Sequence, residues 1–167
     1  DFNDSDSLLV ALSNSDVVFC SIGTTQKKVK GDKEAYRKID FDIPVKLARF
    51  SKMAGCEKFI LVSSIGANSK GNNFYIKLKG EVEDVVKTIG QRSLHIMRPS
   101  FLLGERKKFR IGEVMGKVFM KLFSFVIPTK YKAIQAKDVA KAMVAIAKKN
   151  DQGVFSYEYD QIKELSQ

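Results

Sequence analysis

The 167-residue sequence contains two cysteines and one histidine, and each scarcity excludes a class of protein. Cys20 and Cys56 are too few for the disulfide framework of a small secreted domain. Each cysteine lies beside an apolar run, so we expect buried, reduced thiols. His95 has no cluster of further ligands at metal-binding spacing, so the sequence predicts no zinc or other metal site.

Long apolar runs are also missing, since none approaches the ~18–20 residues that a membrane-spanning helix needs. The first six residues, DFNDSD, are acidic and lack the basic-then-apolar layout of a secretory signal. We therefore expect a cytoplasmic protein with no membrane partner. An apolar fraction of 44% and a charged fraction of 29% are ordinary for one soluble domain, or a large part of one, over residues 1–167.

The net charge of +10 is concentrated partly in two basic runs, residues 27–30 and 106–110. Such runs can bind the phosphates of nucleic acids, membranes or dinucleotides, but they more often form solvated loops. No RNA- or DNA-binding motif accompanies them, so a nucleic-acid partner is not expected.

Short apolar runs alternate with longer helical patterns along the chain. The patterns predict strands at 17–22, 58–63, 93–98 and 154–159, and helices at 6–13, 35–54, 75–90, 111–125 and 138–148. Pro44 could break the second helix, and Asp138 could cap the last one. Apolar strands that alternate with helices of this length favour an α/β fold, a doubly wound parallel sheet with helices on both faces.

The predicted strand at 58–63 ends in two serines, and a helical pattern that contains a tyrosine and a lysine follows. Ser63 and Ser64 close the strand, while Tyr75 and Lys79 lie four apart at the start of the helix and so share one face. A hydroxyl, a phenol and an ammonium brought together form a proton-transfer site for a carbonyl/alcohol pair. The same spacing recurs in the C-terminal tail, so the spacing alone could also mark an exposed helix face. The position after a strand end favours the catalytic interpretation.

Ligands of parallel sheets bind beyond the carboxyl ends of the strands. Three predicted strand ends carry small or hydroxyl residues: Gly23-Thr24-Thr25, Ser63-Ser64 and Pro99-Ser100. We expect all three to line one crevice.

These segments together resemble the atypical, NAD(P)H-binding (NmrA-like) branch of the short-chain dehydrogenase/reductase superfamily, in the group of the Tat-interacting tumour-suppressor oxidoreductase and its bacterial relatives. The matching segments are FCSIGTT at 19–25, AGCEKF at 54–59, SSIGA at 63–67, Tyr75, KGEVE at 79–83, RPS at 98–100 and RIGE at 110–113. The resemblance implies a Rossmann-like fold, NADP or NAD as cofactor, and oxidoreductase activity on an unknown carbonyl/alcohol substrate.

The resemblance also implies roles for single residues. Tyr75 would give or take the proton, and the Lys79 ammonium would favour the phenolate and bind the nicotinamide ribose. Ser64, in preference to Ser63, would position the carbonyl oxygen. The family also has a supporting asparagine in the preceding helix, which has no clear counterpart in this sequence; Asp40 lies nearest to its position. Besides Tyr75 and Lys79, the implied cofactor contacts are Asp1, Phe2, Ile22, Gly23, Thr24, Pro99, Leu102 and Arg110, with a substrate-side region around residues 104–136.

One departure from the family is large, because no Gly-rich strand–loop–helix turn that would hold a pyrophosphate is present. We therefore expect residues 1–167 to correspond to the C-terminal part of such a domain, with the 17–22 strand at an open sheet edge. Alone, this segment should aggregate, form a molten state or dimerise, and a homodimer of the whole protein stays open. Two alternatives remain: a catalytically silent NAD(P)H-binding sensor or scaffold, and a sugar-nucleotide epimerase or dehydratase of the extended branch.

Overall fold

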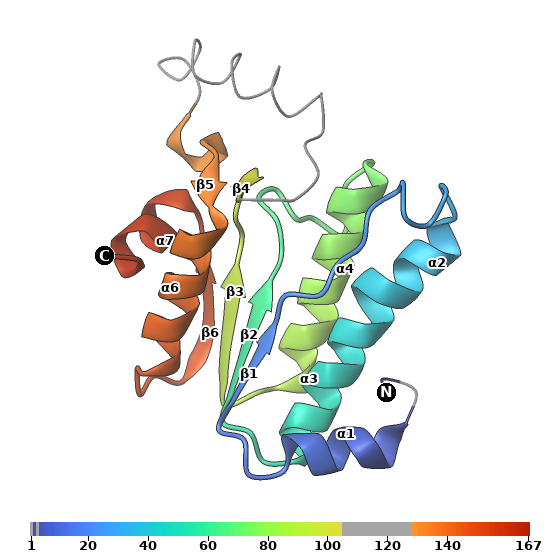
Figure 1. The fold of residues 1–167 in the computed structure, drawn as a ribbon, viewed down its shortest axis with the longest axis vertical. Coiled ribbons are helices and arrows are strands. Elements are labelled where there is room, and N and C mark those ends of the chain that lie inside the picture. Colours follow the sequence, from blue (N-terminus) through green and yellow to red (C-terminus); the bar gives the residue numbers. More distant parts are fainter. Residues whose placement is uncertain (1, 3, 105–127) are drawn as a thin grey trace.

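The computed structural model describes residue 2 and residues 4–104 and 128–167. Its centre is a parallel sheet in the order β1-β2-β3-β6 (Figure 1). The strands are β1 (Val17–Cys20), β2 (Lys58–Val62), β3 (Ser93–Met97) and β6 (Gly153–Tyr157). A second, two-stranded parallel sheet pairs β4 (Leu102–Leu103) with β5 (Ile134–Gln135) beyond the carboxyl end of β3. The predicted α/β, Rossmann-like fold class is confirmed.

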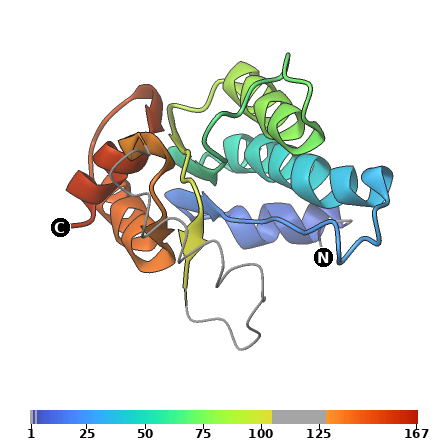
Figure 2. The same cartoon turned by 90° about the horizontal axis from the view of Figure 1, so that it is seen from above.

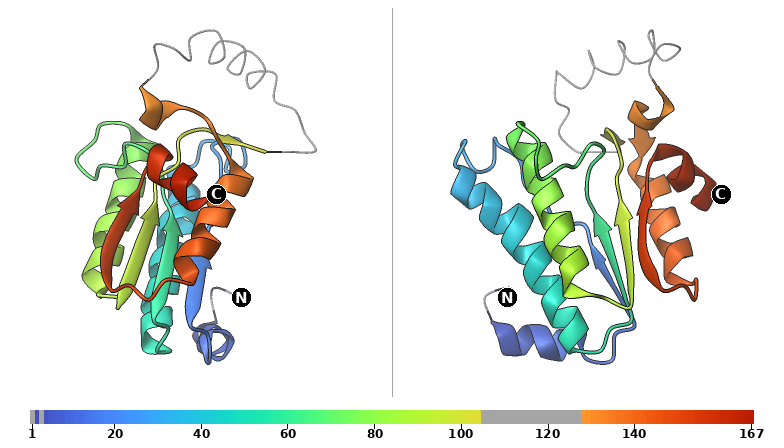
Figure 3. Two further views of the ribbon diagram at one scale, coloured as in Figure 1. Left: turned by 90° about the vertical axis from the view of Figure 1, so that its left-hand side faces the viewer. Right: turned by 180° about the vertical axis from the view of Figure 1, so that it is seen from behind.

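Helices cover both faces of the sheet (Figures 2 and 3). One face packs against α1 (Ser5–Leu12), α3 (Ile43–Met53) and α4 (Phe74–Ile89), and the other against α6 (Ala136–Ala147) and α7 (Tyr159–Leu165). Successive residues of β2 alternate between the two cores, since Phe59 and Leu61 join the first and Ile60 joins the second. All three side chains are at most 2% exposed. This burial on both faces explains the continuous apolar runs in the sequence.

The predicted helix at 35–54 forms without a break, but it is not uniform. It consists of α2 (Lys33–Arg37), a π-helical turn η1 (Lys38–Asp42) and α3. Pro44 lies in the first turn of α3, where a missing N–H group is tolerated. The π-helical turn carries a buried acid, Asp40, on the side of the helix that faces the sheet ends. Single π turns often accompany functional sites.

Two details of the C-terminal part differ from the predictions. The last strand ends at Tyr157 rather than at 159, because Glu158 and Gln161 form a capping box that begins α7. Asp138 is not a cap: it lies inside the first turn of α6 and pairs with Lys163 of α7 at 2.8 Å. The predicted helix at 111–125 lies outside the described residues.

Within the described residues, β1 pairs only with β2 and forms the edge of the sheet, as expected. Phe19 on this strand is 48% exposed, an unusual value for a large apolar strand residue. Cys20 and Cys56 are buried and free, also as expected. None of the helices in the described part of the chain is long and apolar enough to cross a membrane.

Candidate active site at the carboxyl ends of the strands

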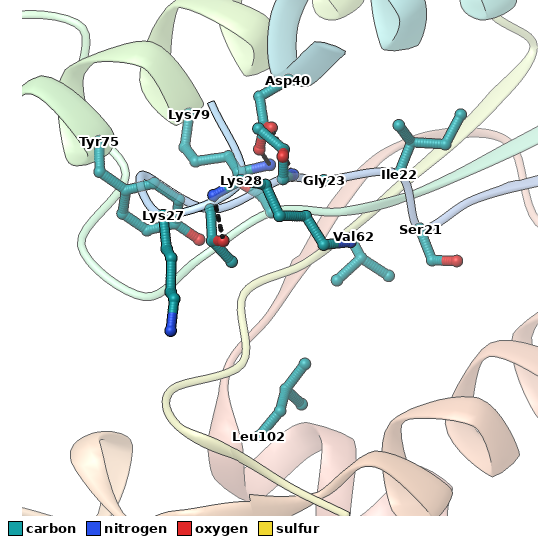
Figure 4. Close-up of a pocket in the computed structure, with 13 residues that line it drawn as sticks. Ser21, Ile22, Gly23, Lys27, Lys28, Asp40, Val62, Tyr75, Lys79 and Leu102 are labelled. Carbon is teal, nitrogen blue, oxygen red and sulfur yellow. Dashed lines mark hydrogen bonds and ion pairs between the residues drawn. The ribbon is translucent and has the colours of Figure 1, made fainter. Parts of the chain in front are cut away.

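A cavity of 750 Å³ opens where β1 and β2 end (Figure 4). Its walls come from the loop after β1, the end of β2, the start of α4, the π-helical turn and β4. The lining residues are Ser21, Ile22, Gly23, Thr24, Thr25, Lys27, Lys28, Asp40, Val62, Ser63, Tyr75, Lys79 and Leu102. The crevice predicted from the strand ends therefore exists for the first two of the three strand ends.

Tyr75 and Lys79 both reach this cavity from the first turns of α4. The helix begins there because the Asn73 side chain accepts hydrogen bonds from the N–H groups of Tyr75 and Ile76. The Nζ atom of Lys79 lies 5.8 Å from the centre of the Tyr75 ring. Tyr75 is 37% exposed, whereas Lys79 is 6% exposed. The phenol is thus open to a ligand, and the ammonium lies at the bottom of the site.

Asp40 holds the Lys79 ammonium in place. Its Oδ1 atom lies 3.1 Å from Lys79 Nζ, and its Oδ2 atom accepts the Thr24 N–H at 2.6 Å. One buried carboxylate therefore joins the loop after β1 to helix α4. Burial, and then the Asp40 carboxylate, raise the pKa of nearby Tyr36 to about 12, so Tyr36 stays protonated and its hydroxyl lies 3.4 Å from the Thr24 carbonyl.

The two strand-end serines differ in whether they line the cavity and in the hydrogen bonds of their hydroxyl groups. Ser63 lines the cavity and is 6% exposed, but its hydroxyl donates to Glu83 Oε1 at 2.6 Å. Ser64 is not among the lining residues, and its hydroxyl has only a long contact, 3.4 Å, to the Ile65 carbonyl. The Ser63 proton is therefore committed to Glu83, while the Ser64 proton has no strong acceptor among the described residues.

Glu83 is itself held by an arginine from the end of β3. Arg98 donates through Nε to Glu83 Oε1 at 3.0 Å and makes a second, short contact to Oε2. The hydrogen bonds from Arg98 to Glu83 raise the pKa of the arginine, so the half-buried guanidinium stays charged beside the buried Glu83. Glu83 is the last residue of the KGEVE segment at 79–83. The sequence could not predict its pairing with Arg98, because that contact depends on where β3 ends in the fold.

Of the expected cofactor contacts, Ile22, Gly23, Thr24 and Leu102 line the cavity together with Tyr75 and Lys79. Pro99 does not line it; the residue is buried and its carbonyl accepts the Ile65 N–H at 2.9 Å. Phe2 is not among the lining residues either. Its carbonyl accepts a hydrogen bond from Lys46 on α3. Asp1 and Arg110 lie outside the described residues.

The residues present fit a ribose and a nicotinamide ring. A phenol and an ammonium provide hydrogen-bond partners for ribose hydroxyls, and Ile22, Val62 and Leu102 provide apolar walls. Gly23 keeps space open at this point, since a Cβ atom there would lie 3.3 Å from Asp40 Oδ1. In the described part of the chain, no group of three or more histidine, cysteine or acidic residues could hold a metal ion.

Lys27 and Lys28 are lining residues that the sequence marked only as part of a basic run. The sequence could not predict that they lie at the cavity, because they are far from Tyr75 along the chain. The fold of the loop after β1 brings them to the mouth of the cavity (Figure 4).

The α/β, Rossmann-like fold is shared with solved structures that hold NAD or NADPH. The structure resembles MoeE5 in complex with UDP-glucose and NAD, with a TM-score of 0.67 and 15% identity over 98% of this chain and 66% of that one. It also resembles RMD from Pseudomonas aeruginosa complexed with NADPH, with a TM-score of 0.66 and 17% identity over 99% of this chain and 69% of that one. At these identities the likeness shows the fold.

The chain belongs to the HIM1 family, whose model matches residues 2–132. It is 36% identical to Protein HTATIP2 of Rattus norvegicus over 71% of this chain and 48% of the relative. It is also 36% identical to the mitochondrial protein FMP52 of Debaryomyces hansenii over 77% of this chain and 58% of the relative. The chain thus spans about half the length of these relatives. The predicted atypical short-chain dehydrogenase/reductase is confirmed at the level of the family.

The predicted cytoplasmic location is wrong by this comparison, because the FMP52 relatives are named as mitochondrial proteins. The expectation rested on the absence of long apolar runs and of a secretory signal, and neither absence distinguishes the cytoplasm from mitochondria.

Proposed function

We propose that this protein is an NAD(P)H-dependent oxidoreductase that acts on a carbonyl/alcohol pair. The observation that carries the proposal is the joint position of the Tyr75 phenol and the Lys79 ammonium in one cavity at the ends of parallel strands. Membership of the HIM1 family and the NAD- and NADPH-bound structures of the same fold support it.

A nicotinamide dinucleotide bound in the cavity would supply or accept the hydride. Tyr75 transfers the proton to or from the substrate oxygen through its exposed hydroxyl. Lys79 hydrogen-bonds the ribose hydroxyls, and its Nζ atom lies 5.8 Å from the centre of the Tyr75 ring. Ser64 orients the substrate oxygen, since its hydroxyl proton is not committed to a carboxylate.

Asp40 acts through Lys79 and the loop after β1. Its carboxylate fixes the Lys79 Nζ atom and holds the Thr24 N–H, so that the floor of the cavity is set before a ligand arrives. Ile22 and Leu102 would provide apolar walls for the nicotinamide ring.

The test is a titration of the complete protein with NADPH and NADH by calorimetry, followed by absorbance assays of hydride transfer to a panel of aldehydes and ketones. We expect saturable binding of at least one dinucleotide and turnover of at least one carbonyl compound. The absence of binding below the millimolar range would overturn the proposal.

A second function is favoured by one observation. The Asp40 carboxylate pairs with Lys79 and offsets the positive charge that would act on Tyr75. A catalytically silent NAD(P)H-binding sensor or scaffold would retain this cavity without turnover. Saturable cofactor binding with no hydride transfer to any tested compound would favour this alternative.

The mitochondrial relatives also suggest a location. We place the protein in mitochondria, by analogy with the FMP52 proteins. Subcellular fractionation with mitochondrial and cytosolic markers tests this, and a purely cytosolic distribution would contradict it.

A further inference from the structure

The mouth of the cavity carries two exposed lysines, Lys27 and Lys28, that the proposed proton transfer does not use. Both belong to the loop that joins β1 to α2. In Figure 4 the Lys27 side chain extends toward the open space between Tyr75 and Leu102. Both lysines therefore line the same cavity as Tyr75.

The loop that carries these lysines is held by its own hydrogen bonds. The N–H of Lys28 donates to the Thr25 carbonyl at 2.8 Å, and the N–H of Gly31 donates to the Gln26 carbonyl at 3.0 Å. Gly31 adopts a φ of +83°, which allows the chain to turn back toward α2. At its start the loop is attached to Asp40 through Thr24. The backbone positions of both lysines are thus fixed before a ligand binds.

The charges at the cavity do not balance. Among its described lining residues the one acid is Asp40, and that carboxylate is already bound to Lys79 and to the Thr24 N–H. Neither Lys27 nor Lys28 forms an ion pair with any described residue. A cleft whose surplus charge has one sign attracts and retains ligands of the opposite sign.

We propose that Lys27 and Lys28 form an anion-binding subsite that holds a phosphate or carboxylate group of a ligand in this cavity. This inference deepens the proposed function, on which it rests, by assigning a chemical group to the same cavity. Two sources share the required chemistry: a phosphate of the dinucleotide and an acidic group on the carbonyl substrate.

The test compares Lys27→Gln/Lys28→Gln with Lys30→Gln in the complete protein. Lys30 is a matched control because it is exposed on the same loop but does not line the cavity. The first probe is pyrophosphate, followed by calorimetry. We expect the double variant to bind pyrophosphate on the order of tenfold more weakly than the wild type, with little change in the control.

Two further arms separate the sources. A loss of affinity for NADPH and NADH in the double variant assigns the subsite to the cofactor. A loss of preference for 4-carboxybenzaldehyde over benzaldehyde, with cofactor affinity unchanged, assigns it to the substrate. Either result supports the subsite.

The proposal is overturned if the wild type does not bind pyrophosphate, if the double variant equals the wild type in all three arms, or if Lys30→Gln causes the same loss. The pyrophosphate arm needs neither cofactor nor turnover. A protein that binds no dinucleotide would therefore refute the proposed function while this arm still decides on the subsite.

Discussion

The ammonium of Lys79 lies 3.1 Å from the carboxylate of Asp40, and both side chains are buried. The two residues come from different helices, and the same carboxylate also holds the loop after β1. Removal of one partner leaves an uncompensated charge in the protein interior.

We predict that Asp40→Ala lowers the free energy of unfolding by about 3 kcal/mol. Combining it with Lys79→Met should cost less than the sum of the two single changes, because neither charge is then left alone. Urea denaturation of the four proteins measures this coupling. Strictly additive losses would mean that the pair contributes no interaction of its own.

The two strand-end serines should respond differently to substitution. Ser63→Ala removes the donor to Glu83 and should lower stability by about 1 kcal/mol. Ser64→Ala should leave stability nearly unchanged, since its hydroxyl has only a 3.4 Å contact, but should reduce kcat, because the proposed function assigns this hydroxyl to the substrate oxygen. Thermal melts and steady-state kinetics on both variants check this. A reduced kcat in Ser63→Ala together with a normal kcat in Ser64→Ala would instead assign the substrate contact to Ser63.

A methyl group at Gly80 should disturb the site. The ideal Cβ position lies 2.1 Å from the Ser69 nitrogen and 2.3 Å from the Asn68 carbonyl carbon, so the backbone after β2 would have to move. We expect Gly80→Ala to destabilise the protein by about 3 kcal/mol, at the upper end of overpacking costs. Gly104→Ala is the control, since its nearest contact would be an ordinary 3.7 Å. Equal stability of the two variants would contradict the tight packing of the loop on α4.

His95 should make the protein sensitive to mild acid. Its ring is fully buried between Ser93 and Tyr157, and burial lowers its pKa although Asp151 opposes this shift. The unfolded chain takes up a proton near pH ~6.5 that the folded protein does not. The free energy of unfolding therefore has its full value above this pH. It falls as the pH is lowered, by up to about 1.4 kcal/mol per pH unit.

Urea denaturation between about pH 7 and pH 5.5 measures this slope, and His95→Gln should make it shallower. An unchanged slope in the variant would assign the acid sensitivity to other groups.

The strands and helices of the described part could be predicted because burial on both faces leaves continuous apolar runs, as in β2. The helix α7 was missed because its start depends on a capping box between Glu158 and Gln161 and not on an apolar pattern. The π-helical turn could not be predicted either, because no local pattern in the sequence marks it.

The pairing of Tyr75 with Lys79 followed from helical spacing, which is a local property. The partners of Ser63 and Lys79 come from segments 20 and 39 residues away, respectively, and such contacts depend on the tertiary fold. For the same reason Lys27 and Lys28 could be recognised as basic but not placed at the cavity.

The most direct measurement of the central claim is the turnover of Tyr75→Phe on a compound that the wild type reduces. We predict a loss of about 10²–10⁴-fold in kcat with nearly unchanged NADPH affinity, because only the proton donor is removed. Tyr159→Phe, which changes the tyrosine of the other Tyr–Lys spacing on α7, should keep full activity. Full turnover by Tyr75→Phe would contradict the assignment of this cavity as the catalytic site.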